Sequence, residues 1–225
     1  MAKTKAKARN RFAPGKASGL AFDPIAAVRD LAKSDATLGR LMKAVGPFGI
    51  EIRGMQDPFG SLAESIVYQQ LTGKAAATIY GRVAALYLPK RRLRPEDVLA
   101  TTDEKLRGAG LSGAKTAALK DLAAKTIDGT VPAMAVLAKL DDDTIVERLT
   151  EVRGIGRWTV EMMLMFRLGR PDVLPATDYG VRKGFARLFR KRKLPEPKAL
   201  LAYGERWRPY RSVASWYLWR ATELP

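Results

Sequence analysis

The sequence predicts a nearly all-α fold, and three observations lead to this class. From Asp23-Pro24 onward, apolar residues recur at the three- and four-residue spacing of amphipathic helices. No segment shows the alternating pattern of a half-buried strand, and no internal repeat is apparent. Proline, glycine and small polar residues separate the periodic segments, as is typical of helix ends. With 225 residues, 47% of them hydrophobic, the chain can bury a sizeable core as one domain or two small lobes.

Taken in order, helices are predicted over 24–33, 35–45, 58–71, 74–87, 95–100, 103–108, 113–128, 132–138, 142–152, 157–168, 179–190, 196–206 and 209–222. Asp57-Pro58 is a good start signal for a helix. The segments are separated by breaks at Pro89, Gly129, Gly169-Arg170-Pro171 and Pro195. Only Gly49 to Arg53 is expected to form a short extended piece.

Residues 1–19 combine regularly spaced lysines and arginines with Gly, Ala, Ser and Pro, the composition of a disordered basic arm. Such an arm either adds non-specific affinity for DNA or is a solubilising tail. The helical core then spans 20–225. We place one lobe on residues 58–172, and a second lobe on 20–57 together with 173–225.

The charge of the chain indicates a polyanionic partner. Lys and Arg number 40 and Asp and Glu 23, giving a net charge of +17. Membrane surfaces also attract basic proteins, but no apolar stretch is long enough to span a bilayer, and the apolar residues fall at core spacing within helices. We therefore expect nucleic acid as the partner rather than lipid.

The chain contains no cysteine and no histidine. This composition excludes a thiolate nucleophile, an iron–sulfur cluster, an imidazole base and a Cys/His zinc site. Catalysis must therefore rest on carboxylate, amine or hydroxyl groups. Because the N-terminus lacks the apolar run of a secretory signal, a location in the bacterial cytoplasm or nucleoid is expected.

The most informative segment is the turn Gly154-Ile155-Gly156, which lies between two amphipathic runs and predicts a tight turn joining two helices. The amides that open the second helix have no partners within it, and the helix dipole favours an anion there, such as a DNA phosphate. An ordinary helix-turn-helix core explains the turn alone equally well. A second glycine-rich string, Gly108 to Gly113, matches G-x-G-x-x-G but follows a helical run rather than a strand. A turn near Lys115 is therefore expected, not a dinucleotide site.

Asp178 stands directly before the amphipathic run that begins at Tyr179. Taken alone, this position indicates an N-cap, in which the carboxylate accepts from the first amides of its helix.

Three separated segments change this interpretation. They are the hairpin, Pro175-Ala176-Thr177-Asp178, and WRPYRSVASWYLWRAT at 207–222. Together they resemble the helix-hairpin-helix/Gly-Pro-Asp superfamily of DNA base-excision glycosylases, and within it they look most like the 3-methyladenine DNA glycosylase II group. The resemblance covers roughly 57–222 and includes SIVYQQLTGKAAATI at 65–79, similar to the family's segment near the DNA minor groove.

The resemblance implies two helical lobes around a DNA-binding cleft, with Asp178 as the catalytic residue. It places DNA contacts at Arg153, Gly154, Ile155, Gly156, Arg157, Gln69, Gln70 and Leu71. The base pocket is assigned to Trp158, Trp219, Tyr68 and Met162. No cofactor and no metal held by side chains are expected, although the family implies a monovalent cation at the hairpin carbonyls. The expected partner is double-stranded DNA with alkylated bases, and a monomer is expected.

The chemistry agrees with these roles. An enzyme that acts on a base within a duplex must extrude the nucleotide. Breaking the N-glycosidic bond then develops oxocarbenium charge, which a carboxylate such as Asp178 stabilises while it orients or deprotonates water. An alkylated purine is already cationic and leaves without a histidine to protonate it. We therefore expect a monofunctional glycosylase acting in base excision repair.

Several alternatives remain open at the level of single residues. In family members that also cut the backbone, a lysine lies two residues beyond the second hairpin glycine. That position is Trp158 here, which either stacks on a cationic base or packs in the core. Gln70 or Leu71 is the candidate wedge, although helix packing explains Leu71 equally well. Trp216 is expected in the core.

Two other functions compete with the simple hydrolase. One is a helix-hairpin-helix protein that binds DNA damage without chemistry. The other is a bifunctional glycosylase/lyase that uses a different lysine, such as Lys183, as nucleophile.

Overall fold

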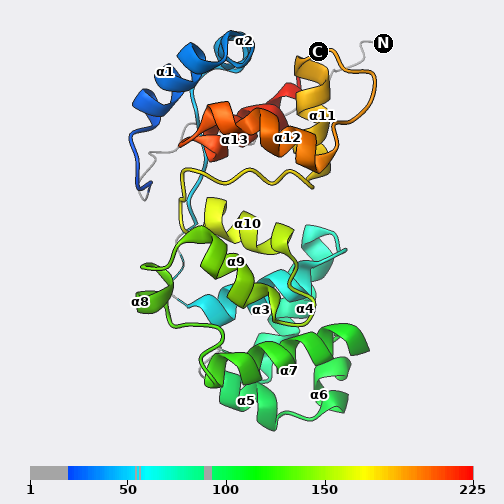
Figure 1. Cartoon of the computed structure of the whole chain (residues 1–225). Helices are drawn as coiled ribbons and strands as arrows, with labels where there is room; N and C mark the ends of the chain where they lie inside the picture. Colours follow the sequence, from blue (N-terminus) through cyan, green and yellow to red (C-terminus); the bar gives the residue numbers. More distant parts are fainter. Residues whose placement is uncertain (1–19, 54, 56, 89–92, 225) are drawn as a thin grey trace, which may run out of the picture. The chain divides into compact units, whose positions relative to one another are not determined.

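The computed structural model describes residues 20–53, 55, 57–88 and 93–224. Every regular element among these residues is a helix (Figure 1), which confirms the predicted all-α class. The predicted basic arm at 1–19 and the break at Pro89 lie outside the described residues. The chain divides into two compact units. We call residues 1–53 and 169–225 the terminal unit, and residues 54–168 the middle unit.

The middle unit consists of α3 (Pro58–Tyr68), α4 (Gly73–Ala85), α5 (Pro95–Ala100), α6 (Asp103–Gly108), α7 (Gly113–Ile127), α8 (Met134–Leu137), α9 (Asp142–Thr150) and α10 (Arg157–Phe166). Four of these helices begin at a side chain that accepts from an amide of the first turn: Thr72, Thr102, Ser112 and Asp141. Their apolar faces meet in a core that includes Leu62, Ile66, Leu119 and Leu122, all fully buried. Local capping and apolar periodicity together account for the positions of these helices.

Helix α3 ends at Tyr68, three residues before the predicted end at 71. The next residues turn sharply, because Gln70 has a φ of +56°, in the left-handed region that non-glycine residues seldom adopt. The residues between α3 and α4, Gln69 to Thr72, form what we call the α3–α4 loop. Leu71 in this loop is 39% exposed, so the interpretation of Leu71 as a buried helix residue is wrong.

The terminal unit consists of α1 (Pro24–Ser34), α2 (Ala36–Val45), α11 (Tyr179–Leu188), α12 (Pro197–Gly204), a 3-10 turn η1 (Glu205–Trp207) and α13 (Arg211–Ala221). Helices α11 and α13 approach each other closely, because a Cβ at Gly184 would overlap the backbone carbonyl of Leu218. The predicted extended piece, Gly49 to Arg53, is irregular and pairs with no strand.

A buried carboxylate joins the N-terminal helices to the C-terminal part of the terminal unit. Asp35 is 6% exposed and caps α2 by accepting from two amides of its first turn. Its second oxygen accepts from Tyr203 Oη at 3.1 Å and from Trp207 Nε1 at 3.0 Å. Because a buried carboxylate requires such donors, this cluster fixes α2 against η1.

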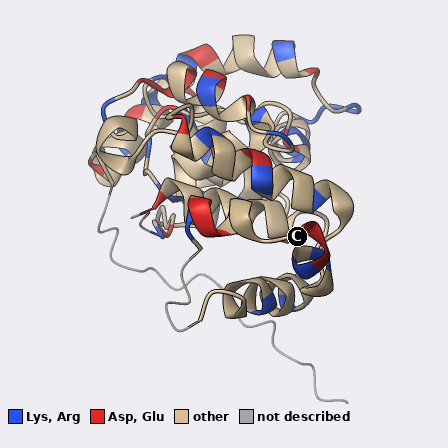
Figure 2. Ribbon diagram, turned by 90° about the horizontal axis from the view of Figure 1, so that it is seen from below, with Lys and Arg blue, Asp and Glu red and all other residues tan. Residues whose placement is uncertain are grey.

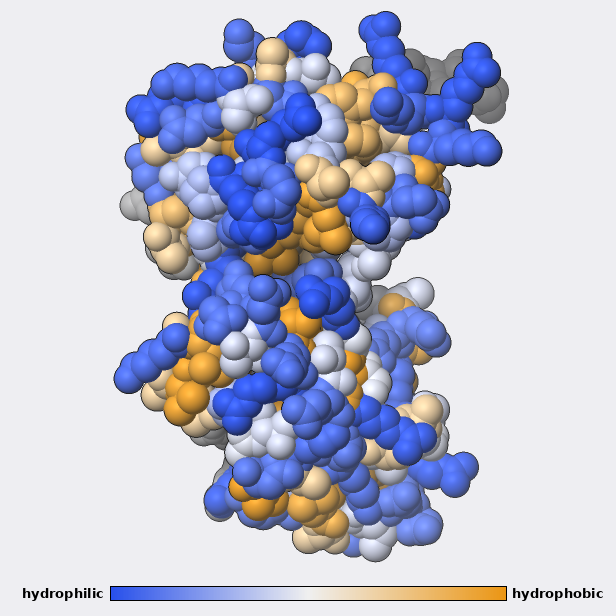
Figure 3. All heavy atoms as spheres, in the orientation of Figure 1, coloured by the Kyte–Doolittle hydropathy of each residue, from blue (hydrophilic) through white to orange (hydrophobic). Residues whose placement is uncertain are grey.

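The surface of both units is rich in charge. Figure 2 shows Lys and Arg residues spread over many helices, with Asp and Glu interspersed. Figure 3 shows hydrophilic residues over most of the visible face, with smaller apolar patches between them. Among the described residues, no helix is both long and apolar enough to cross a membrane.

Candidate active site

The predicted site residues fall into two groups, one in each unit. The middle unit holds the hairpin, the α3–α4 loop and Trp158, and the terminal unit holds Asp178 and Trp219.

The hairpin joins α9 to α10 through residues 151–156, which we call the hairpin turn. Gly154 has a φ of +79°, and a Cβ there would lie 3.3 Å from the Cβ of Ala118 on α7. Glycine is therefore favoured at 154 both by its backbone conformation and by its approach to α7. Ile155 is buried, so contact with DNA from this residue is confined to its main chain.

Helix α10 differs from its neighbours at its N-terminus. Its N-cap is Gly156, which has no side chain to accept from the first amides. Arg157 follows directly and is exposed, as is Arg153 before it. Positive charge and helix-opening amides therefore coincide at this end of α10, which suits a phosphate group.

The α3–α4 loop is tied to the hairpin turn. Gln69 Nε2 donates to the carbonyl oxygen of Gly154 at 2.8 Å, across 85 positions of sequence. The side-chain amide of Gln69, a predicted DNA contact, thus donates to a carbonyl within the protein. The next two residues, Gln70 and Leu71, are exposed. Two predicted DNA-contacting segments are in this way held against each other.

Trp158 lies in the first turn of α10 and is 45% exposed, so the interpretation of this residue as core packing is wrong. Met162 follows one helical turn later and is partly exposed. Tyr68 at the end of α3 packs edge-on against Tyr80, with ring centroids 6.4 Å apart. Sequence reasoning missed Tyr80, whose pKa is raised by burial and by the nearby Glu64 and Asp57 carboxylates.

In the terminal unit, Asp178 is the N-cap of α11 and its Oδ1 accepts from the Val181 amide at 2.8 Å. The same oxygen accepts from Trp219 Nε1 at 2.8 Å, across 41 positions of sequence. The capping interaction expected from the sequence is therefore confirmed, and an indole donor is added to it. Asp178 is partly exposed rather than sealed within the helices.

Gly180 makes this pairing possible. A Cβ at this position would lie 2.7 Å from Trp219 Cδ1 and 3.2 Å from Asp178 Oδ1. Any side chain would therefore displace the indole from the carboxylate. This requirement could not be predicted from the local sequence, because Gly180 and Trp219 lie on different helices.

The segment that leads to Asp178 is bound to the start of α13. Ser212 Oγ accepts from the Val173 amide at 2.9 Å and donates to the Arg170 carbonyl at 2.7 Å. Arg211 Nε donates to Asp172 at 2.7 Å. Helix α13 thus holds both the approach to Asp178 and, through Trp219, the carboxylate itself.

Comparison with known proteins identifies the family of the chain. The family model described as HhH-GPD superfamily base excision DNA repair protein matches residues 63–209. The chain belongs to this superfamily. It is 37% identical over 192 residues to DNA-3-methyladenine glycosylase 1 of Schizosaccharomyces pombe, covering 84% of each chain. It is 29% identical to DNA-3-methyladenine glycosylase 2 of Escherichia coli, over 82% of this chain and 64% of that one.

A solved structure of the Schizosaccharomyces pombe 3-methyladenine DNA glycosylase in complex with abasic DNA shares the fold. Its TM-score is 0.76 at 36% identity, covering 88% of this chain and 97% of that one. The family assignment made from the hairpin, Asp178 and the C-terminal run is therefore confirmed. For this HhH-GPD protein, the roles of individual site residues stay predictions.

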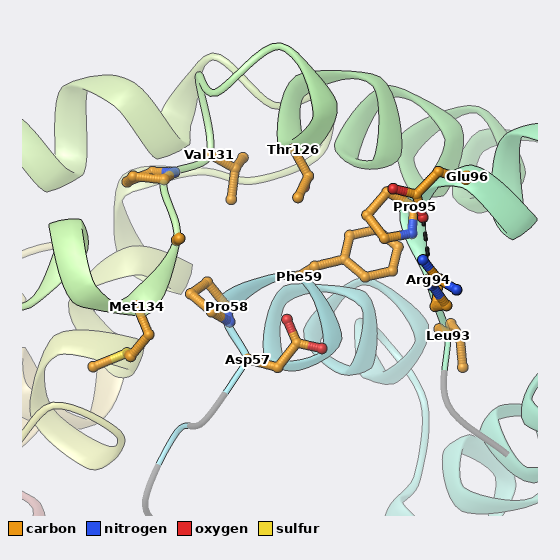
Figure 4. A pocket seen from close by; sticks show the side chains of 12 residues that line it. Asp57, Pro58, Phe59, Leu93, Arg94, Pro95, Glu96, Thr126, Val131 and Met134 are labelled. Carbon is orange, nitrogen blue, oxygen red and sulfur yellow. Dashed lines mark ion pairs between the residues drawn. The ribbon is translucent and has the colours of Figure 1, made fainter. Parts of the chain in front are cut away.

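The middle unit of this HhH-GPD protein also contains an open pocket of about 780 Å³ that none of the predicted site residues line. Figure 4 shows Phe59, Val131 and Met134 on its walls, together with the Arg94–Glu96 ion pair at 3.7 Å. It lies where α3, α5 and α8 begin and α7 ends. Sequence reasoning missed this pocket, since its lining comes from four separate helix ends.

No group of three or more Asp, Glu, His or Cys residues suited to a metal ion occurs in the part of the chain that the structure describes. Within the hairpin turn, the Glu151 carbonyl accepts from Lys125 Nζ and the Val152 carbonyl from the Ile155 amide. These donors, with Gln69 on Gly154, already serve three hairpin carbonyls. The monovalent cation expected there stays a prediction.

Proposed function

We propose that this protein is a monofunctional DNA glycosylase that hydrolyses the N-glycosidic bond of alkylated purines in double-stranded DNA. The observation that carries the proposal is the partly exposed Asp178 carboxylate, held between the first turn of α11 and the indole of Trp219. The relatives named DNA-3-methyladenine glycosylase support 3-methyladenine as a substrate, and 7-methylguanine is proposed with it as a second cationic alkylated purine.

DNA binding is assigned to the hairpin turn and the start of α10. The uncapped amides of α10 and the exposed Arg153 and Arg157 supply positive potential for the backbone. Gln70 and Leu71 project from the α3–α4 loop as candidates to fill the gap that an extruded nucleotide leaves. Extrusion costs a few kcal/mol in general, and less where damage has weakened pairing.

In the chemical step, the bond between C1′ of the deoxyribose and the ring nitrogen breaks, and its electron pair leaves with the base. A cationic alkylated purine becomes neutral in this step and therefore needs no acid. The ionised Asp178 carboxylate stabilises the positive charge that develops on the sugar. Water adds its oxygen to C1′ and loses a proton, which leaves an abasic site and the free base.

Trp158 supports the monofunctional assignment. An indole nitrogen cannot form the imine that a backbone-cutting lyase requires. Its exposed face instead suits stacking on an electron-poor base by cation–π attraction. Lys183, the alternative nucleophile, is exposed on α11 with its Nζ 6.0 Å from the centre of the Tyr179 ring.

The test is single-turnover release of 3-methyladenine or 7-methylguanine from defined duplexes. Asp178→Asn keeps an oxygen for the Val181 amide and the Trp219 indole but removes the negative charge. We expect the rate to fall by about 10²- to 10³-fold, the scale of losing one electrostatic stabiliser. Affinity for an abasic-site duplex should change little, because the backbone contacts are intact.

The two alternative functions, a damage-binding protein and a lyase, predict different results on the same duplexes. Tight, salt-sensitive binding by the wild type without release of any base would establish a damage-binding protein. A covalent protein–DNA adduct trapped by borohydride, and lost in Lys183→Met, would establish a lyase. An Asp178→Asn protein with the wild-type rate would reject Asp178 as the catalytic residue.

A further inference from the structure

The side chain of Lys115 is directed into the protein. It lies in the first turn of α7, and its Nζ donates to the carbonyl oxygens of Val67 at 2.7 Å and Gln69 at 2.9 Å. These carbonyls end helix α3, where the dipole is negative and no further helical amide follows. The pKa of Lys115 is lowered by burial, so the ammonium has given up part of its hydration to reach them.

The same face of α7 also holds the hairpin turn. Asp121 Oδ2 accepts from the Arg153 amide at 2.7 Å and from Lys125 Nζ at 3.2 Å. Lys125 in turn donates to the Glu151 carbonyl. Residues 115, 118, 121 and 125 follow one another at three- or four-residue spacing, and residue 118 is the alanine against which Gly154 packs.

One helix face thus anchors two segments that are predicted to contact DNA. Directly after the anchored Val67 and Gln69, Gln70 keeps its left-handed backbone, which costs on the order of 1 kcal/mol or more for a residue with a side chain. Such a conformation persists only where the surroundings determine it. The Lys115 bonds to Val67 and Gln69, and the Gln69 bond to Gly154, supply that constraint on the N-terminal side of Gln70.

We propose that Lys115 is a positioning residue for base extrusion. Its ammonium fixes the α3–α4 loop against the hairpin turn, so that Gln70 and Leu71 enter the duplex at a set depth while the hairpin grips the backbone. Lys115 touches neither the base nor the sugar. The proposal rests on the glycosylase function above and adds to it a residue that acts on extrusion and not on bond cleavage.

The experiment compares one lesion in two settings. 7-Methylguanine is placed in a duplex and in a single strand of the same sequence, because a single strand needs no unpairing. Lys115→Met keeps the length of the side chain and loses both bonds. We expect its single-turnover rate on the duplex to fall by about tenfold to a hundredfold, the scale of one charge-assisted hydrogen bond, because only part of the lost interaction acts on extrusion. Its rate on the single strand should stay within about twofold of the wild-type rate.

The matched control is Lys120→Met, on the same helix. Lys120 pairs with Asp103 of α6 and makes no bond to the α3–α4 loop or the hairpin turn among the contacts described. Its duplex and single-strand rates should both match the wild-type rates. Lys115→Arg retains charge and several donors, so it should recover most of the duplex rate.

The outcomes distinguish a failure of the proposed glycosylase function from a failure of the positioning role of Lys115. If the wild type releases no base from either substrate, the glycosylase function fails. If the wild type is active and Lys115→Met has an unchanged ratio of duplex to single-strand rate, the positioning role is overturned, whether both rates fall together or neither falls. If Lys115→Met does not fold, the same ratio is measured in Lys115→Gln, whose shorter side chain cannot reach both carbonyls. A duplex-to-strand ratio at least tenfold below the wild-type ratio then supports the role, and an equal ratio overturns it.

Discussion

Replacing Gly180 by alanine tests how tightly the Asp178 carboxylate depends on Trp219. The new Cβ would lie 2.7 Å from Trp219 Cδ1 and 3.1 Å from Nε1. Carbon atoms in ordinary contact lie about 3.5 Å apart, so the indole must move by about 0.8 Å. The Nε1–Oδ1 distance is 2.8 Å now, and a shift of this size along it leaves no hydrogen bond.

We do not expect Gly180→Ala to unfold the protein. Gly180 lies in the first turn of α11 with a helical backbone, where alanine is favoured by up to about 1 kcal/mol. That gain opposes the cost of moving one partly exposed indole, so we expect a free energy of unfolding within about 1 kcal/mol of the wild-type value. Without the Trp219 donor the Asp178 carboxylate keeps the hydrogen bond from the Val181 amide but can shift. A misplacement of about 1 Å can cost 10²-fold in rate, so excision should fall by about that factor.

The assay is single-turnover base release from a 7-methylguanine duplex, with thermal unfolding measured on the same samples. Gly81→Ala is the matched control, because Gly81 lies in the middle of α4 with open space around its would-be Cβ. It should gain stability and keep the wild-type rate. A Gly180→Ala protein that is folded and excises at the wild-type rate would refute the link between the Trp219 contact and catalysis.

Three further predictions concern stability and binding. Asp35→Ala removes the buried acceptor of Tyr203 and Trp207, and denaturant unfolding should show a loss of about 3 kcal/mol; an unchanged midpoint would contradict the role of this cluster. Burial raises the pKa of Tyr217 to about 12, so the stability it contributes is present below pH 10 and is lost as the pH rises to about 12. Between pH 10 and 12 the unfolding free energy of the wild type should therefore fall more steeply than that of Tyr217→Phe, and parallel curves would show that the tyrosine titrates normally. Arg153→Gln should lower the slope of log affinity against log salt by about 0.9 if the guanidinium neutralises one phosphate, and an equal slope would remove it from the DNA contacts.

Much of the fold could be predicted because its signals are local. Side-chain caps such as Ser112 and Asp141, and the glycines of the hairpin turn, act on amides a few residues away. The prediction extends α3 too far: at its observed end the Val67 and Gln69 carbonyls accept from Lys115, which lies 46 positions beyond Gln69 in the sequence. Apolar periodicity continues through Leu71 and carries no information about that distant ammonium.

The candidate site was predicted only in part for the same reason. Asp178 could be singled out by its position before a helix and by family resemblance, but the choice between a cap and a catalytic group could not be made locally. The structure shows the cap and adds the Trp219 donor, so the two interpretations do not exclude each other. Capping fixes the direction of the carboxylate, which is also what a stabiliser of developing charge requires.

In both groups of site residues, a glycine makes room for a side chain of a distant helix. Gly154 lets the hairpin turn reach Ala118 of α7, and Gly180 lets the indole of Trp219 reach Asp178. Helix propensity alone would favour alanine at Gly180, so its missing side chain is explained by the neighbour it admits and not by the helix that contains it. In each case the neighbour belongs to a helix distant in sequence. In both groups of site residues a side chain therefore approaches a backbone more closely than a Cβ would allow. Hydrophobic patterning does not predict this requirement, and a single added methyl group at Gly180 tests it.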